Sequence, residues 1–172
     1  MATITTSHDG LPDTSMTASL GELLRPAQIR VPLAATTRQG AIEELVDLVS
    51  ASGEIPDPAA LKRTVWEREQ LRSTGIGEGL AIPHGKCAGA RGLLLAVGTA
   101  RQPIEFDSID GKPVRLVALL VSPPERITDH IQALGRLSRL MSVASFRERA
   151  YSARDAAELF SMLRDADVTS VA

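Results

Sequence analysis

The chain has 172 residues, of which 44% are hydrophobic and 3% aromatic, a composition that suits one globular domain with an aliphatic core. Its formal net charge is -2, so the sequence excludes a basic nucleic-acid-binding protein and predicts no nucleic-acid partner. No apolar run approaches the roughly 20 residues of a membrane span, and the single cysteine, Cys87, excludes an internal disulfide or a thiolate metal cluster. We therefore expect a cytoplasmic protein with no membrane insertion and no bound metal or cofactor.

The N-terminal region is predicted to be a flexible tail over residues 1–17, because it is rich in Thr, Ser, Asp and Gly and has little apolar periodicity. His8 lies in this tail, and we assign it no role. Ser19 and Glu22 have the spacing of a capping box, which predicts a short helix starting there. Residues 28–33 alternate in polarity and are predicted to form a strand.

Two longer helices are predicted next, over residues 37–52 and 57–71. The first has apolar residues at i, i+3, i+4 and i+7, and Gly53 is expected to end it. The second begins with Asp57 as N-cap and Pro58 in the first turn. One side of this second helix is predicted to carry Leu61, Val65 and Arg68.

Residues 73–86 are predicted to be irregular, because several glycines and Pro83 break both helix and strand. Two apolar runs, 92–100 and 114–121, predict strands, with a turn over 107–113 between them.

The C-terminal region is predicted to be helical. One helix starts near Thr128 and presents an apolar face made by Ile131, Leu134, Leu137 and Met141. A short helix is expected with Ser145 and Glu148 as its capping pair, and a last one over 154–163. Helices before, between and after the strands predict a mixed α/β (α+β) single domain over residues 18–165, followed by a tail over 166–172.

The glycines of segment 73–86 first suggest a nucleotide-binding loop. A Walker loop needs four residues between its first glycine and a Gly-Lys pair that is followed by Ser or Thr. Here five residues separate Gly79 from Gly85, and Cys87 follows Lys86. The dinucleotide fingerprint fails on glycine spacing as well. Both nucleotide interpretations are therefore rejected.

The same segment contains His84 between a proline and a glycine. Pro83 fixes the approach of the chain, and Gly85 is expected to leave one flank of the imidazole uncovered. A neutral imidazole is a good nucleophile near pH 7 and can accept a phosphoryl group and release it again. Transfer of this kind depends on positioning and charge stabilisation. The segment therefore favours phosphoryl chemistry at His84.

Three sequence blocks carry a specific resemblance: Arg68-Glu69 with 73–77 and Ala81 to Lys86, then 103–114, then 129–134. Together they resemble enzyme IIA of the bacterial sugar phosphotransferase system, fructose/mannitol type, and most closely its nitrogen-regulatory branch. The resemblance covers roughly residues 20–163. It implies a mixed central β-sheet flanked by helices on both sides. It also implies an acid-labile phosphate on His84, with Nε2 as the acceptor nitrogen.

The resemblance places two further active-site residues. The family's active-site arginine falls on Arg68, whose guanidinium can hold phosphate oxygens in a bidentate manner. Its second active-site histidine falls on His130, which can donate a hydrogen bond to the phosphoryl group or orient the first ring. Alternatively, Arg68 only solvates the face of its helix, and His130 is an ordinary helix residue beside the caps Thr128 and Asp129. Ser73 and Thr74 could contact a phosphate or only shape a turn.

Two residues near His84, Glu78 and Cys87, are not explained by the family resemblance. Glu78 stands where the regulatory branch often has Asn, and a carboxylate beside the phosphoryl site would repel phosphate unless it points away. Cys87 is expected to fill space, as is Trp66.

Three functions stay open at this point. The first is a sugar-transport component that takes phosphate from the phosphocarrier HPr, or a paralogue, and passes it to a IIB domain. The second is a regulatory module, in which phosphorylated His84 is a switch toward a sensor kinase or an ion transporter. The third is a phospho-dead binding module, against which the presence of His84 argues. The absence of IIB and IIC segments in the sequence favours regulation.

Overall fold

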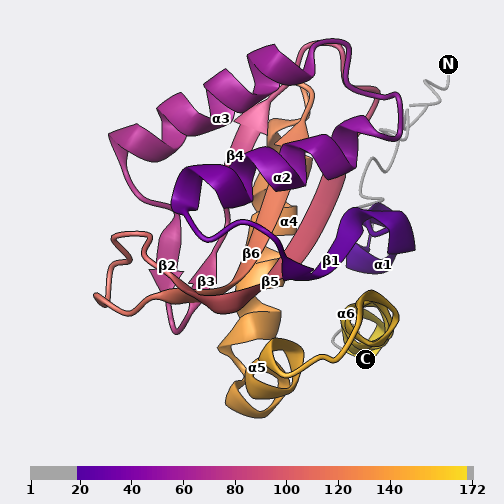
Figure 1. Cartoon of the computed structure of the whole chain (residues 1–172). Helices are drawn as coiled ribbons and strands as arrows, with labels where there is room; N and C mark the ends of the chain where they lie inside the picture. Colours follow the sequence, from indigo (N-terminus) through magenta and orange to yellow (C-terminus); the bar gives the residue numbers. More distant parts are fainter. Residues whose placement is uncertain (1–18, 170–172) are drawn as a thin grey trace, which may run out of the picture.

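The computed structural model describes residues 19–169, which form a six-stranded mixed β-sheet with helices on both faces (Figure 1). The sheet order is β1-β5-β6-β3-β2, and β4 pairs with β6 beside this path. The strands are β1 (Ile29–Leu33), β2 (Gly75–Gly77), β3 (Leu80–Ala81), β4 (His84–Lys86), β5 (Leu94–Ile104) and β6 (Val114–Ser122). The helices are α1 (Leu20–Leu23), α2 (Arg38–Ser50), α3 (Pro58–Leu71), α4 (Ile127–Ser142), α5 (Ala144–Tyr151) and α6 (Ala156–Thr169), with a 3-10 turn over Pro26–Gln28. The predicted fold class is confirmed.

The helix starts in the first half of the chain follow their capping residues. Ser19 and Glu22 form the predicted capping box at α1. The Thr37 hydroxyl accepts a hydrogen bond from the third residue after it, Gly40, at the start of α2. Asp57 does the same for Ala60 ahead of α3, whose first residue is Pro58. These three helix starts are confirmed.

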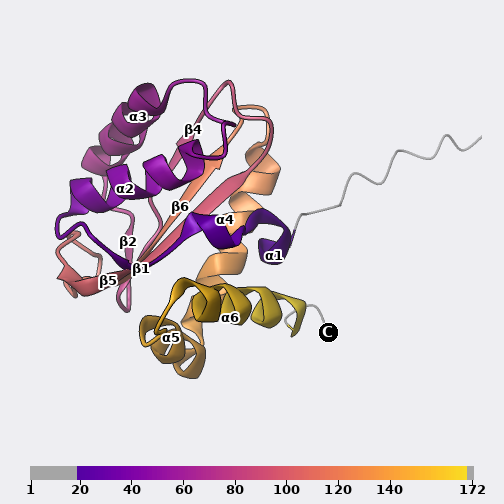
Figure 2. The same cartoon turned by 45° about the vertical axis from the view of Figure 1, so that its right-hand side comes forward.

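Strand β6 and residues 94–99 of β5 are buried on both faces, which explains their continuous apolar runs. Side chains that alternate along them enter two separate cores. Leu94, Leu119 and Val121 pack under α2 and α3, whereas Leu95 and Leu120 pack under α1, α4, α5 and α6. Figure 2 shows α2 and α3 on one side of the sheet and the C-terminal helices on the other.

Segment 73–86 is not irregular, as the sequence predicted, but contributes three short strands. β3 and β4 both run parallel to β6, and Pro83 separates them. The ladder continues across this break because the Pro83 carbonyl accepts a hydrogen bond from the Leu120 N–H at 3.0 Å. Proline lacks an N–H, so it interrupts a strand but still serves as an acceptor. The arrangement makes His84 the first residue of β4, where it lies opposite Leu120 of β6.

Helix α4 starts within one residue of the predicted Thr128, but its predicted caps and part of its predicted inner face are wrong. The helix begins at Ile127 without a side-chain cap, and Asp129 forms an ion pair with Arg126 at 2.6 Å instead. Ile131 is 62% exposed, and His130 faces inward in its place. The buried face is His130, Ala133, Leu137, Leu140 and Met141. Helix α5 likewise follows Val143 without a side-chain cap, so the predicted capping role of Ser145 is wrong.

The limits of the domain stay a prediction. The expected tail over 1–17, with His8, lies outside the described residues, and α6 runs to Thr169. None of the helices within residues 19–169 has the length and apolar character needed to cross a membrane.

Candidate phosphoryl-transfer site

A cavity of about 420 Å³ lies where α3, β2, β4 and α4 meet the 107–109 turn. Arg68 and Arg72 line it from the end of α3 and the residue after it, and His84 from the start of β4. The other lining residues are Ser73, Thr74, Gly75, Ile76, Ile82, Asp107, Ile109, Leu134 and Ser138. Two of the three predicted site residues therefore line one cavity.

The His84 ring is held in one tautomer by the backbone. Its Nδ1 lies 2.9 Å from the carbonyl oxygen of Ile82. A carbonyl can only accept a hydrogen bond, so Nδ1 is the donor and carries the proton. Burial lowers the pKa of His84, an effect that the Ile82 carbonyl partly opposes and the Arg68 charge reinforces. The ring is therefore neutral near pH 7, and its Nε2 has a free lone pair.

Arg68 lies in the last turn of α3, which packs against β4. One of its terminal nitrogens, Nη1, donates to the Arg72 carbonyl at 3.0 Å and so satisfies a free acceptor at the helix end. Arg68 and His84 line the same cavity, and the arginine charge contributes to the lowered pKa of His84. A guanidinium has five N–H donors, so one such bond leaves others for an anion in the cavity.

His130 reaches the same place from the first turns of α4. Its ring centroid lies 5.3 Å from that of His84, and the rings meet edge to face at 70°. Its Nδ1 lies 2.7 Å from the Ser122 hydroxyl oxygen. Burial, with smaller effects of the nearby His84 and Lys86 in the same direction, lowers the pKa of His130 to about 4. The structure thus brings all three predicted residues together.

The low pKa of His130 predicts a pH-dependent stability. An unfolded histidine titrates near 6.5, so below that pH the unfolded chain binds a proton that folded His130 refuses until about pH 4. Stability is therefore lost as the pH falls from about 6.5 to about 4. Between pH 7 and pH 5 we expect the free energy of unfolding to fall by about 1–2 kcal/mol more in the wild type than in His130→Asn. Urea unfolding at both pH values measures this, and parallel losses in the two proteins would contradict it.

A buried carboxylate, Glu69, shapes the cavity wall and was missed from the sequence. Its side chain accepts hydrogen bonds from the Thr74 N–H at 3.1 and 3.2 Å and from the Thr74 hydroxyl at 2.5 Å. The residue is 1% exposed. One signal was available: Leu61, Val65 and Glu69 follow the i, i+4, i+8 spacing of one helix face, the place that we had assigned to Arg68.

The hydroxyl protons of Ser73 and Thr74 are both used within the protein. Ser73 donates to the Phe106 carbonyl, and Thr74 donates to Glu69. Ser73 also accepts from the Gly75 N–H at 3.0 Å. This favours the turn-shaping alternative over a donated hydrogen bond to phosphate.

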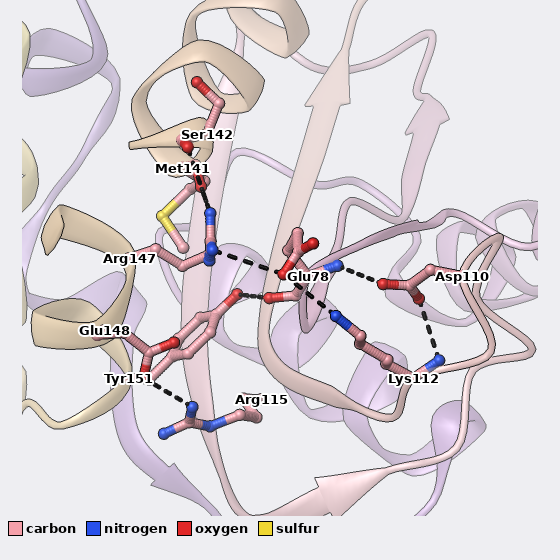
Figure 3. A network of polar contacts seen from close by, with 9 residues as sticks. All are labelled: Glu78, Asp110, Lys112, Arg115, Met141, Ser142, Arg147, Glu148 and Tyr151. Carbon is pink, nitrogen blue, oxygen red and sulfur yellow. Dashed lines mark hydrogen bonds and ion pairs between the residues drawn. The ribbon is translucent and has the colours of Figure 1, made fainter. Parts of the chain in front are cut away.

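Glu78 lies outside this cavity, in a polar network with α5 and the 110–112 turn (Figure 3). Its carboxylate lies 3.5 Å from both Lys112 Nζ and Arg147 Nη2. Its own backbone has a φ of 55°, and it is held by Asp110, which accepts from its N–H, and by Tyr151, which donates to its carbonyl. Burial raises the pKa of Tyr151 to about 12, so the phenol stays a donor. The Glu78 carboxylate is thus paired with two cationic side chains, outside the cavity that His84 lines.

Gly85 also has a packing role that the sequence did not predict. A Cβ at this position would lie 2.8 Å from the Val65 Cγ2, so glycine allows β4 to approach α3. Cys87 and Trp66 pack at the edge of the core, as expected. Among residues 19–169, no group of three or more His, Cys, Asp or Glu side chains could hold a metal ion.

Comparison with known protein families gives a match over nearly the whole described chain. The family described as phosphoenolpyruvate-dependent sugar phosphotransferase system, EIIA 2, matches residues 22–166. The chain belongs to this EIIA 2 family. The predicted resemblance is confirmed, and His84, Arg68 and His130 therefore meet within an EIIA 2 domain.

Some relatives are named nitrogen regulatory proteins, and others are named components of sugar phosphotransferase systems. A nitrogen regulatory protein of Bradyrhizobium diazoefficiens is 32% identical over 143 residues, which cover 83% of this chain and 92% of the relative. The 2-O-alpha-mannosyl-D-glycerate-specific EIIABC component of Escherichia coli is 39% identical over 132 residues, 76% of this chain. The chain spans only 20% of that relative's length and 23% of the fructose-specific EIIABC component of Bacillus subtilis.

Solved structures agree with this assignment. The nitrogen regulatory protein IIA-Ntr of Neisseria meningitidis superposes with a TM-score of 0.78 at 32% identity, covering 84% of this chain and 98% of that one. The mannitol IIA of Escherichia coli, solved in complex with phosphorylated mannitol IIB, superposes with a TM-score of 0.71 at 21% identity, covering 81% and 96%. The mannitol IIA, which has this fold, thus associates with a IIB domain.

Proposed function

We propose that this protein is a phosphoryl carrier that accepts phosphate at His84 from an HPr-type phosphocarrier and acts in regulation. The observation that carries the proposal is the His84 ring, whose Nδ1–H is bound to the Ile82 carbonyl in a cavity shared with Arg68. This arrangement leaves Nε2 as the nucleophile. Relatives named nitrogen regulatory proteins, matched over most of their length, support the regulatory role.

In the transfer step, the lone pair of His84 Nε2 attacks the phosphorus of the donor's phosphohistidine and forms a new P–N bond. The P–N bond to the donor nitrogen breaks, and the electron pair returns to the donor ring, which leaves as a neutral imidazole because its other nitrogen carries a proton. His84 keeps its own proton on Nδ1, bound to the Ile82 carbonyl, so charge and protons balance across the transfer. Arg68 offsets the charge on the phosphoryl oxygens, and His130 offers an N–H to them. These roles of Arg68 and His130 come from the family resemblance and from their place beside His84.

Exposed apolar side chains lie close to this cavity. Ile76 is 46% exposed and Ile109 76% exposed, and both line the cavity itself. Leu71, at the end of α3, is 85% exposed. Such a group of exposed apolar residues is typical of a protein-binding surface. We infer that the phosphocarrier docks here and that this protein works in the cytoplasm with its donor.

The proposal predicts one acid-labile phosphate on His84. After incubation with phosphoenolpyruvate, enzyme I and HPr or a paralogue, we expect an intact mass gain of about 80 Da. The gain disappears in His84→Ala and after acid treatment. His8→Ala, which removes the one histidine to which we assign no role, is the matched control and keeps the phosphate. A wild type that gains nothing while a control IIA is phosphorylated would reject the proposal.

A sugar-transport role is the second candidate, favoured by the 39% identity with the mannosyl-glycerate EIIABC component. The two roles separate when phosphorylated protein is mixed with a fructose- or mannitol-type IIB domain. Transfer of the phosphate to IIB supports transport. Retention of the phosphate, with phosphorylation-dependent binding to a sensor kinase or an ion transporter, supports regulation.

A further inference from the structure

Ser122 is the last residue of β6 and lies beside His130, whose ring contacts that of His84. It lies opposite Lys86 in the parallel ladder, and its carbonyl accepts the Cys87 N–H at 2.9 Å. The side chain is 1% exposed, and its hydroxyl oxygen lies 2.7 Å from His130 Nδ1. A buried hydroxyl this close to a ring nitrogen forms a hydrogen bond in one of two directions.

The direction of this bond decides what His130 offers to the cavity. A neutral imidazole carries one proton, on Nδ1 or on Nε2. If Nδ1–H donates to Ser122, Nε2 is an acceptor and repels phosphoryl oxygens, which are acceptors too. If the Ser122 O–H donates to Nδ1, the proton is on Nε2, and the ring can donate to the phosphoryl group. Only the second direction suits an anion on His84.

We propose that Ser122 is a positioning residue, whose hydroxyl donates to His130 Nδ1 and thereby keeps the His130 proton on Nε2 for the phosphoryl group. The inference rests on the proposed function of His84. The two histidines are then complementary: a backbone carbonyl keeps the proton of His84 on Nδ1, and a hydroxyl keeps that of His130 on Nε2. One ring is thus the nucleophile and the other the donor.

The first test reads the tautomer directly and needs no transfer. Ring ¹⁵N NMR of the unphosphorylated wild type at pH 7 is expected to show His130 protonated at Nε2 only, and His84 at Nδ1 only. In Ser122→Ala we expect a mixture of both His130 tautomers, with His84 unchanged. Ser122→Thr keeps a hydroxyl and restores the single form. A wild-type His130 protonated at Nδ1 would overturn the inference even if His84 is phosphorylated normally.

The second test measures the rate of phosphate acceptance from HPr. We expect Ser122→Ala to be slower by roughly tenfold, about the value of one hydrogen bond to a charged group, and Ser122→Thr to recover. In a His130→Ala background, Ser122→Ala should have no further effect, because the two residues act as one unit. Thr99→Ala removes another buried hydroxyl, on β5 opposite Leu116, and serves as the control for packing loss.

The outcomes separate the two proposals. Equal rates for wild type and Ser122→Ala, or additive losses with His130→Ala, overturn the role of Ser122 while phosphorylated His84 stands. No phosphorylation of the wild type by any donor rejects the function itself, and with it the purpose of the Ser122 bond. Loss of rate without the tautomer change assigns Ser122 to packing alone and also overturns the inference.

Discussion

Arg68→Ala is expected to slow phosphate acceptance at His84 by about 100-fold, because it removes the guanidinium that offsets charge on the transferring group. The reason lies in the cavity, which Arg68 lines together with His84 and a second arginine, Arg72. Arg68→Lys should recover only part of the rate, since an ammonium lacks the planar fork that binds two oxygens. Single-turnover transfer from phosphorylated HPr, followed by intact mass, measures the rate.

The control for Arg68 is Arg63→Ala, which removes the same charge from an exposed site on the same helix. It is expected to transfer phosphate at the wild-type rate. Because Arg68 also binds the Arg72 carbonyl, its loss should lower the free energy of unfolding by about 1 kcal/mol. That loss is too small to unfold the protein, so a rate deficit is not a folding deficit. Equal rates in Arg68→Ala and Arg63→Ala would remove Arg68 from the site.

The elements that could be predicted are those whose signals are local. The caps Ser19, Thr37 and Asp57 fix helix starts by contacts within three residues. The runs of β5 and β6 are long and apolar because both faces are buried. By contrast, β2, β3 and β4 have two or three residues each and exist through pairing with distant partners. Such pairing leaves no periodic pattern in so short a segment.

The site shows a similar division. His84, Arg68 and His130 were predicted from motif resemblance, and the inward turn of His130 is what displaced Ile131 from the predicted face of α4. A polar residue on a buried helix face breaks the hydrophobic pattern from which such a face is predicted. Ser122 could not be found, because its partner lies on another element and nothing in its local sequence separates it from a strand end.

Glu69 is the buried charge on which the cavity wall depends, and its removal is expected to have the largest effect on stability. Glu69→Ala leaves the Thr74 N–H and hydroxyl without their acceptor in a site that is 1% exposed. We expect the free energy of unfolding to fall by about 3 kcal/mol, the usual cost of leaving buried donors unsatisfied. Chemical denaturation measures this change. Glu67→Ala, an exposed neighbour on α3, should change it by less than about 0.5 kcal/mol.

Glu69→Gln separates the charge of this residue from its hydrogen bonds. The amide keeps one acceptor oxygen for Thr74, so the loss of stability should be smaller, about 1–2 kcal/mol. Because the Glu69 carboxylate raises the pKa of His84, neutralising it should lower that pKa further. An NMR titration of the His84 ring detects this shift, with Glu67→Gln as control. An unchanged His84 pKa in Glu69→Gln would show that the carboxylate shapes the cavity wall without acting on the nucleophile. A lowered pKa would show that one buried group both holds Thr74 in place and tunes the ring that accepts phosphate.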